Sequence, residues 1–349
     1  MRLALSAGVR RHAVVQGRRQ RPDPKFFAGS GKVEEIAAAV KALNAGFAVF
    51  NHELAPSQVR NLEKRLACRV LDRAELILEI FAQRAQTSEG KLQVELAQLE
   101  HQSTRLVRGW THLERQRGGL GKTGGPGEKQ IELDRRYIAN RVRVLKEKME
   151  VLKKQRRVQR RARARRGVPA ISLVGYTNAG KSTLFNALSH AGAHAADRLF
   201  DTLDTTTRRV WLPEAGALTL ADTVGFVRGL PHGLIAAFRA TLEETVHADL
   251  LLHVVDAASE LREAQAAEVG KVLAEIGAAA VPQILVWNKI DAAGLAPGVE
   301  RDQYGRISRV RVSARTGAGL EGLRGAIAEA IGARAAAGQA VSSPEFLSI

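Results

Sequence analysis

The sequence has almost no cysteine: Cys68 is alone among 349 residues. One cysteine cannot close an intramolecular disulfide or build a multi-cysteine zinc site, which excludes a disulfide-stapled secreted scaffold and most structural metal folds. Long apolar runs are also missing, because the longest, such as Leu250 to Val255, fall far short of the ~20 residues that a membrane-spanning helix needs. The nine histidines show no metal-ligand spacing. We therefore expect no membrane span and a reducing, cytoplasmic environment.

Acidic residues are absent from the first 22 positions, which carry five arginines before Arg21. Organellar transit peptides share this composition, so targeting to an organelle stays open. Over the whole chain the net charge is +17, and it is unevenly placed. Residues 1–168 hold 37 Lys and Arg against 17 Asp and Glu, whereas residues 169–349 hold 16 against 19. The basic half favours nucleic acid as partner, with an anionic membrane surface, and thus partial membrane association, as the second choice.

The N-terminal part shows a short α/β pattern. An amphipathic helix is expected over 33–43, a buried strand over 47–50, a helix over 62–66 and a strand over 69–71. Beyond Asp72 two long helical stretches flank a glycine-rich segment at 117–127. Their apolar stripes, Leu92 to Leu106 and Ile138 to Leu152, predict an antiparallel helical hairpin with the glycine-rich segment at its tip.

The second of these helical stretches is unusually basic. Residues 135–166 hold 15 Lys and Arg but only two Glu, a net charge of +13. A solvated helix normally mixes charge signs to gain pairs one turn apart, and this one does not. Like charges repel one another unless a polyanion screens them, so the run predicts contact with nucleic acid.

From Val168 onward, strand-like and helical segments alternate. Strands are expected over 171–174, 217–221, 250–255, 284–287 and 310–312, and helices over 181–189, 235–246, 260–276 and 320–331. This alternation predicts a mostly parallel sheet that is covered by helices on both faces.

One segment of this region has the spacing of a phosphate-binding loop. Gly175 to Ser182 (GYTNAGKS) matches G-x-x-x-x-G-K-[ST] between a predicted strand and a predicted helix. Glycines let backbone N–H groups wrap phosphates at the helix N-terminus, Lys181 can reach the β and γ phosphates, and the Ser182 hydroxyl can ligate Mg²⁺.

Three further segments follow in the order that a GTPase requires. Asp222 (DTVG) ends a strand and can hold Mg²⁺ through water, while the Gly225 N–H can meet the γ phosphate. Asp291 (NKID) offers a carboxylate to the two adjacent N–H donors of guanine, which adenine lacks. Ser313 and Ala314 end the last strand, where a backbone N–H can meet guanine O6. Four such segments in order at strand ends indicate a guanine-nucleotide switch.

This set of motifs resembles the translation-factor class of GTPases, and the whole chain resembles the HflX family of ribosome-associated GTPases. The resemblance rests on GYTNAGKST, DTVGF and NKID, on LAPSQVRNL from Leu54, on IFAQRAQTSEGKLQVELAQL from Ile80, and on the glycine-rich tip. It covers residues 25–335, and it implies that Phe200 to Asp204 is the first switch, with Thr202 as a further Mg²⁺ ligand. Asn178 matches the asparagine that holds K⁺ in related GTPases; a loop-stabilising hydrogen bond is the alternative role.

The catalytic water has no obvious side chain to orient it. Many GTPases place glutamine directly after Asp-x-x-Gly, whereas this sequence has Phe226. We therefore expect slow intrinsic hydrolysis that the ribosome stimulates, with the water positioned by backbone, a cation or the bound partner. The candidate catalytic residues are Lys181, Thr202 and Gly225.

The remaining expected GTP-binding residues share these four motifs and the first switch. They are Gly175, Tyr176, Thr177, Asn178, Ala179, Gly180, Lys181, Ser182, Phe200, Asp201, Thr202, Leu203, Asp204, Asp222, Thr223, Val224, Gly225, Asn288, Lys289, Ile290, Asp291, Ser313 and Ala314.

We therefore predict an α/β fold with three domains and a tail. A shortened α/β domain spans 1–72, a helical hairpin with tip 117–127 and basic arm 135–166 spans 73–167, a P-loop GTPase domain spans 168–335, and the tail spans 336–349. The resemblance implies a monomeric GTPase that binds GTP and GDP, docks on the large ribosomal subunit and its rRNA, and splits stalled or idle ribosomes. A GTPase that assembles the large subunit is the alternative.

Overall fold

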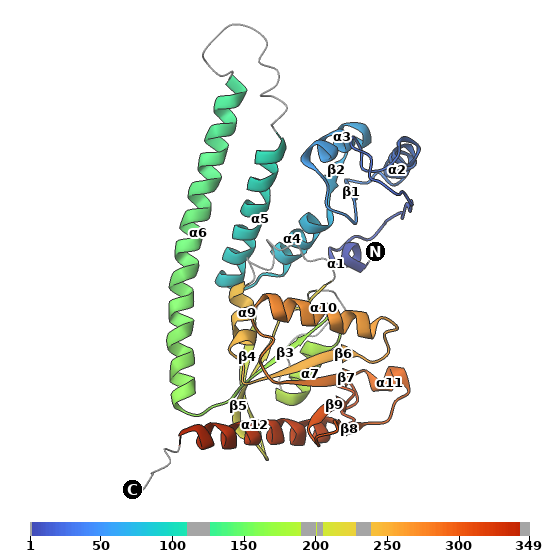
Figure 1. The fold of residues 1–349 in the computed structure, drawn as a ribbon. Coiled ribbons are helices and arrows are strands. Elements are labelled where there is room, and N and C mark those ends of the chain that lie inside the picture. Colours follow the sequence, from blue (N-terminus) through green and yellow to red (C-terminus); the bar gives the residue numbers. More distant parts are fainter. Residues whose placement is uncertain (1, 110–125, 190–199, 201–204, 228–238, 343–349) are drawn as a thin grey trace, which may run out of the picture. The chain divides into compact units, whose positions relative to one another are not determined.

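The structure is a computed structural model that describes residues 2–109, 126–189, 200, 205–227 and 239–342. The chain divides into two compact units, one built on residues up to Leu152 and the other on residues from Lys153 onward (Figure 1). The first holds a two-stranded sheet and the second a seven-stranded sheet. No helix among the described residues is long and apolar enough to cross a membrane.

The N-terminal unit begins with a small α/β arrangement. Its elements are α1 (Arg2–Ser6), α2 (Ser30–Leu43), β1 (Phe47–Val49), α3 (Pro56–Leu66) and β2 (Arg69–Leu71). The strands pair in parallel, with Phe47 opposite Arg69, because α3 returns the chain across the sheet. Val33, Leu54, Leu62, Leu66 and Val70 form the core. The predicted α/β pattern is confirmed, and α3 starts six residues earlier than the helix expected at 62, with Pro56 in its first turn.

Three helices follow β2: α4 (Arg73–Arg84), α5 (Ser88–Gly109) and α6 (Pro126–Arg165). Figure 1 shows α5 and α6 running in opposite directions. Leu145 and Met149 are buried, while most of the other side chains of the described part of α6 are exposed. Ion pairs join Arg141 to Glu95 at 2.6 Å and Lys146 to Glu100 at 2.8 Å. The predicted apolar stripe of α6 is therefore its inward face; residues 110–125, which include most of the expected tip, lie outside the described residues.

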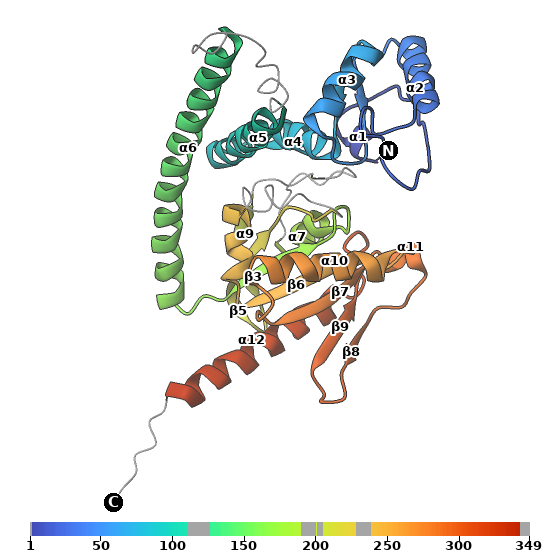
Figure 2. The ribbon, with the colours of Figure 1, turned by 45° about the horizontal axis from the view of Figure 1, so that its top comes forward.

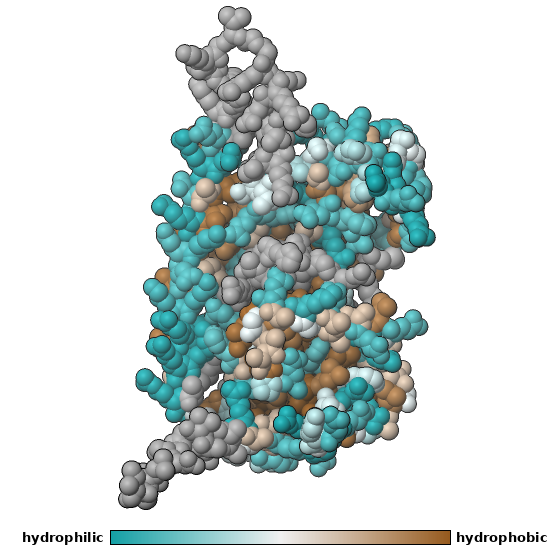
Figure 3. Space-filling model, viewed as in Figure 1, coloured by the Kyte–Doolittle hydropathy of each residue, from teal (hydrophilic) through white to brown (hydrophobic). Residues whose placement is uncertain are grey.

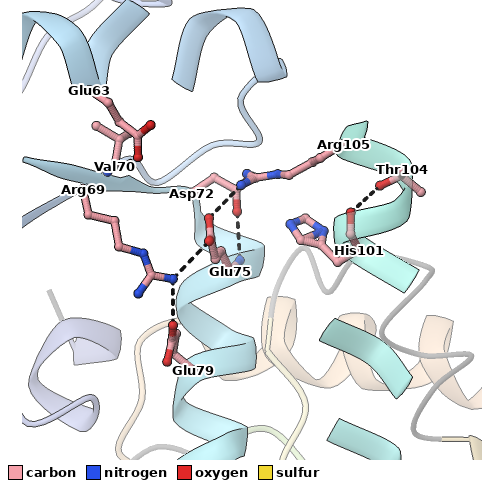
Figure 4. Close-up of polar contacts among 9 residues, drawn as sticks. All are labelled: Glu63, Arg69, Val70, Asp72, Glu75, Glu79, His101, Thr104 and Arg105. Atoms are coloured by element: carbon pink, nitrogen blue, oxygen red, sulfur yellow. Dashed lines mark hydrogen bonds and ion pairs between the residues drawn. The ribbon is translucent and has the colours of Figure 1, made fainter. Parts of the chain in front are cut away.

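A buried ionic cluster anchors α5 to the start of α4 (Figure 4). The Asp72 side chain is fully buried and caps α4 by accepting a hydrogen bond from the Glu75 N–H at 2.8 Å. Arg105 of α5 donates to Asp72 at 2.5 Å and to Glu75 at 2.8 Å. Arg69 donates to Glu75 at 3.2 Å and to Glu79 at 2.8 Å. Cations of β2 and α5 thus pair with the carboxylates of Asp72 and the first turns of α4.

The second unit is built on the seven-stranded sheet, whose strand order is β4-β5-β3-β6-β7-β9-β8. The strands are β3 (Ala170–Gly175), β4 (Thr206–Leu212), β5 (Gly216–Asp222), β6 (Leu250–Asp256), β7 (Gln283–Asn288), β8 (Gly298–Arg301) and β9 (Ile307–Arg311). The five central strands are parallel, and the edge strands β4 and β8 are antiparallel to their neighbours. The mostly parallel sheet is confirmed; β4 and β8 were not predicted.

Helices cover both faces of this sheet. They are α7 (Lys181–Ser189), α9 (Arg239–Val246), α10 (Arg262–Glu275), the short α11 (Ile290–Ala293) and α12 (Leu320–Ser342). The side chains of Leu173 and Leu252 pack in one core cluster with residues of α7 and α12. The alternate face packs against α9 and α10, and Figure 2 shows α10 and α12 on opposite sides of the sheet. Burial of both faces explains why the central strands are nearly continuous apolar runs.

Candidate functional site

The predicted motifs gather at the carboxyl edge of the parallel sheet. The strands β3, β5 and β7 end at Gly175, Asp222 and Asn288, and β9 ends two residues before Ser313. Parallel strands deliver their carboxyl ends to one edge, where ligands bind in open α/β sheets. The structure therefore brings together four segments that are up to 139 positions apart in the sequence.

The phosphate-binding loop requires its two glycines. Gly175 has φ +152°, and a Cβ there would lie 2.3 Å from the carbonyl oxygen of Val254. Gly180 has φ +91°, and a Cβ there would lie 2.2 Å from Nδ2 of Asn288. Only glycine fits such positions, because a side chain would strike backbone or a held amide. The loop leads into α7 at Lys181, so its N–H groups open a helix N-terminus toward an anion.

Lys181 is the buried cation of this loop. Its side chain is withdrawn from solvent, and Nζ donates to the carbonyl oxygens of Gly175 at 3.1 Å and Tyr176 at 3.0 Å. Burial lowers the pKa of Lys181 to about 8, although the nearby Asp222 carboxylate opposes the shift. A phosphate group at the loop would supply the countercharge that burial denies this ammonium group.

Ser182 and Asp222 form a hydroxyl–carboxylate pair. Ser182 Oγ donates to Asp222 Oδ2 at 2.6 Å, and Asp222 is buried. Mg²⁺ prefers oxygen ligands of this kind, so the pair fits a magnesium ion, with Ser182 binding it directly and Asp222 through water. The ion, when bound, would offset the charge of the phosphates. Thr202, the third expected ligand, lies outside the described residues, as do Asp201, Leu203 and Asp204.

The segment from Asp222 to Phe226 is fastened to the phosphate loop by its backbone. The Phe226 N–H donates to Gly175 O at 3.1 Å, and the Thr177 N–H donates to Phe226 O at 2.7 Å. A Cβ at Gly225 would lie 2.8 Å from Thr177 Cα and 3.0 Å from Lys181 Nζ. The Phe226 side chain is 1% exposed. The ring is therefore a core side chain, and the backbone of this segment faces the loop.

Asn288 joins the other motifs to the phosphate loop. Its Nδ2 donates to Ala179 O at 2.9 Å, and its Oδ1 accepts from the Ala314 N–H at 2.9 Å. Lys289, at φ +65°, donates from Nζ to Asn178 O at 2.7 Å and to Asp256 Oδ2 at 2.8 Å. Asp256 was not predicted; its place at the end of β6, on the same sheet edge, was the available signal.

The ionised form of the Asp291 carboxylate is favoured by its hydrogen-bond donors. Ser313 Oγ donates to Oδ1 at 2.7 Å, and Arg315 Nη2 donates to Oδ2 at 2.5 Å. The Ser313 hydrogen bond, helped by Arg315, lowers the pKa of Asp291. An ionised carboxylate accepts up to about four hydrogen bonds, so two N–H donors of guanine can be added to these two. Arg315 was not predicted, because its partner is 24 residues away in the sequence.

Two further predicted residues have defined positions. Phe200 is buried and has φ +57°. Asn178 has φ +62°, and its carbonyl accepts from Lys289, so its two proposed roles both stay open. Among the described residues no group of three His, Cys, Asp or Glu side chains could hold a metal ion elsewhere.

Three features lie at one edge of the sheet: a phosphate-binding loop, its hydroxyl–carboxylate pair, and a carboxylate that can accept hydrogen bonds from guanine. Together they define the class of P-loop GTPases. The chain matches three family models: "GTP-binding GTPase N-terminal" over residues 1–82, "GTP-binding GTPase Middle Region" over 84–163, and "50S ribosome-binding GTPase" over 170–289.

Curated relatives extend this likeness over nearly the whole chain. GTPase HflX of Escherichia coli is 54% identical over 328 residues, which cover 94% of this chain and 77% of the relative. GTPase HflX of Magnetococcus marinus is 49% identical over 95% of this chain and 76% of the relative. The chain belongs to the HflX family of GTPases, as its motifs predicted.

A solved structure agrees with the fold. The crystal structure of a complex of SsGBP and GDP is 25% identical, covers 94% of this chain and 92% of that chain, and has a TM-score of 0.52. The chain is therefore a GTP-binding GTPase with the predicted P-loop fold.

Proposed function

We propose that this chain docks on the large ribosomal subunit, contacts rRNA through its basic arm, and separates stalled or idle ribosomes when GTP is bound. The observation that carries the proposal is the surface of α6. Most of its cations between Arg135 and Arg166 are exposed, and the two acids among them, Glu147 and Glu150, leave the run at +13. Figure 3 shows hydrophilic side chains along α6 on the viewed face. Such a surface neutralises phosphates and releases their counterions.

The guanine-nucleotide site supplies the switch. Contacts to the γ phosphate and Mg²⁺ order the switch segments of GTPases and are lost on hydrolysis, which gives two states that a partner can distinguish. The match of residues 170–289 to a model described as a 50S ribosome-binding GTPase supports the large subunit as that partner. The proposed chemistry uses the residues of the four motifs: the loop 175–182, Asp222 to Gly225, Asn288 to Asp291, and Ser313 with Ala314.

Hydrolysis by this site is proposed to be slow until the ribosome binds. The buried ring of Phe226 carries no group that could orient a water molecule. Lys181 and the Gly225 N–H remain to stabilise charge on the phosphates, and Thr202 is proposed to complete the Mg²⁺ ligands. Single-turnover hydrolysis should therefore accelerate when large subunits are added, and equal rates with and without subunits would contradict this part of the proposal.

The role of Asn178 is tested by exchange of the monovalent cation. Asn178→Gly keeps the left-handed backbone, because glycine adopts φ near +62° without strain. If the side chain holds K⁺, wild-type hydrolysis falls when Na⁺ replaces K⁺, and the variant no longer responds. If the side chain only stabilises the loop, wild type and variant respond equally.

The experiment that tests the main proposal sediments intact ribosomes with the protein and GTP, a non-hydrolysable GTP analogue, or GDP. Separation of subunits with GTP and with the analogue, but not with GDP, is expected. Asp291→Asn serves as the control that weakens guanine binding and should abolish the effect at limiting GTP. Binding to immature large subunits alone would instead assign the chain to ribosome assembly, and binding that ignores the nucleotide would contradict a switch.

A further inference from the structure

One cation near the end of the basic arm, Arg160, pairs with two carboxylates of α9. Arg160, near the end of α6, donates from Nη1 to Glu243 Oε2 at 3.1 Å and lies 3.7 Å from Glu244 Oε1. Its side chain is 17% exposed, and the two carboxylates are 19% and 13% exposed. Arg157 and Arg161, its neighbours on the arm, are exposed. The Arg160 side chain therefore pairs with α9 and is largely unavailable to a polyanion.

The helix that carries the two carboxylates contacts the strand that leads into the phosphate loop. Thr245, the next residue of α9, is fully buried, and its Oγ1 lies 3.3 Å from Ser172 Oγ of β3. From Ser172, β3 continues to Gly175, where the loop begins. Two side-chain contacts, joined by the backbones of β3 and α9, thus connect the nucleotide loop to Arg160.

The covalent connection between α6 and β3 is short and contains a glycine. The helix ends at Arg165, and Gly167 has φ +63° with nothing within 4 Å of where a Cβ would be. Gly167 itself therefore adds little steric restraint to the joint, whereas Pro169, whose carbonyl accepts from the Thr219 N–H at 2.8 Å, belongs to the part that the sheet holds. The contact of Arg160 with Glu243 and Glu244 adds a side-chain restraint between the end of α6 and α9, beyond the covalent connection.

We propose that Arg160 is the coupling residue of the switch: its ion pair with Glu243 and Glu244 transmits the nucleotide state of the phosphate loop to the direction of the basic helix α6. This inference rests on the proposed function, because it concerns the regulation of the same RNA-binding arm. A partly buried pair suits the role, since two adjacent carboxylates repel each other once the cation leaves, and the contact is either made or broken. The proposal requires the contact to be made in one nucleotide state and broken in the other, because energetic coupling needs two discrete arrangements.

The test compares Arg160→Met, which keeps the length of the stem, with the matched control Arg161→Met. Affinity for purified large ribosomal subunits is measured with a non-hydrolysable GTP analogue and with GDP. Arg161→Met should weaken binding by the same factor in both states and leave their ratio unchanged. Arg160→Met should move the ratio toward one by about fivefold or more, in the range of typical allosteric coupling. An unchanged ratio in Arg160→Met would overturn the proposal.

A second measurement separates the coupling from ribosome binding. Hydrogen exchange of the backbone amides of residues 155–165 is followed in the free full-length protein with each nucleotide. The wild type should show a nucleotide-dependent difference that Arg160→Met and Glu243→Gln both remove. The same difference in the variants, or no difference in the wild type, would refute the role of Arg160 even if the protein binds ribosomes in a GTP-dependent way. Conversely, ribosome binding that ignores the nucleotide, together with coupled exchange, would contradict only the proposed function.

Discussion

At the scale of single residues, His253 is a buried titratable group that interacts with Lys181 of the nucleotide site. His253 of β6 is 7% exposed, and burial lowers its pKa to about 4, with Lys181 acting in the same direction. The folded protein therefore keeps this histidine neutral, whereas the unfolded chain protonates it near pH 6.5. Stability from this neutral state is present above pH 6.5 and is lost as the pH falls toward 4.

His253→Gln should therefore make the protein less sensitive to acid. The pKa of His253 falls from 6.5 to about 4 on folding. The free energy of unfolding of the wild type should therefore fall by about 3 kcal/mol as the pH is lowered through this range. Thermal unfolding between pH 7 and pH 4.5 measures the difference. His247→Gln, at an exposed position in the same unit, is the control and should keep the acid sensitivity of the wild type. Parallel pH profiles for wild type and His253→Gln would contradict the argument.

The buried ring of Phe226 predicts a structural role. Phe226→Leu keeps an apolar side chain in the core and should lower the free energy of unfolding by about 1 kcal/mol. Intrinsic hydrolysis should change by less than about threefold, because the ring is buried and carries no polar group, and the backbone contacts to Gly175 and Thr177 remain. Single-turnover rates with saturating GTP test this. A hundredfold loss in a variant that stays folded would show that the ring itself shapes the reacting site.

Gly225 is predicted to tolerate no side chain. Gly225→Ala places a methyl group against Thr177 and Lys181, so the segment from Asp222 to Phe226 must leave the phosphate loop. We expect a loss of about 2 kcal/mol in the free energy of unfolding and weaker binding of GDP in calorimetry. Gly270→Ala, in the middle of α10 with open space around it, is the control and should stabilise by about 0.5 kcal/mol. Equal behaviour of the two variants would contradict the packing argument.

At the scale of elements, the ionic cluster of Figure 4 joins α5 to the start of α4 through one side chain of α5, Arg105. Arg105→Met leaves the fully buried Asp72 without its cation, which should cost about 3 kcal/mol in the free energy of unfolding. Arg69→Met removes a cation that is 55% exposed and should cost no more than about 1 kcal/mol. Chemical denaturation of both variants measures the contrast. Similar losses would show that the burial of Asp72 does not set the energy of the cluster.

The sequence pattern predicted elements well where one period dominated. The central strands of the second unit are continuous apolar runs, and the stripe of α6 from Ile138 to Leu152 is its least exposed face. The edge strand β4 was not predicted because the exposed Arg208 and Arg209 interrupt its apolar residues, and β8 was not predicted because it is short and Glu300 and Arg301 follow its single valine. The break between α4 and α5 was not predicted, because residues 85–87 include neither glycine nor proline.

The motifs of the candidate site could be predicted from the sequence, but the side-chain contacts between those motifs could not. The spacing of Gly175 and Gly180 fixed the phosphate loop, since only glycine fits both positions. The partners of Asp291 and Lys289 come from other strand ends, so they follow only from the order of strands in the sheet. The burial of Phe226 was likewise open, because a loop residue can face either side.

At the scale of the whole molecule, charge and switch occupy different parts of the chain. Replacement of Lys153, Lys154, Arg156 and Arg157 by glutamine should weaken binding to large subunits and flatten its dependence on salt. Each phosphate contact makes the slope of log affinity against log salt more negative, by about 0.9 on duplex DNA and about 0.7 on single strands. Binding titrations from 50 to 200 mM salt, roughly the range over which such contacts are felt, measure the slope. Glutamine at Lys271 and Arg306, which are exposed and lie outside α6, should leave the slope unchanged.

The central claim is that GTP makes a basic RNA-binding arm bind its ribosomal partner more tightly. The most direct measurement is the affinity of the full chain for purified large ribosomal subunits, at one ionic strength, with a non-hydrolysable GTP analogue and with GDP. Binding should be tighter with the analogue by about tenfold or more, which corresponds to about 1.4 kcal/mol of coupling. Equal affinity with the two nucleotides would contradict it.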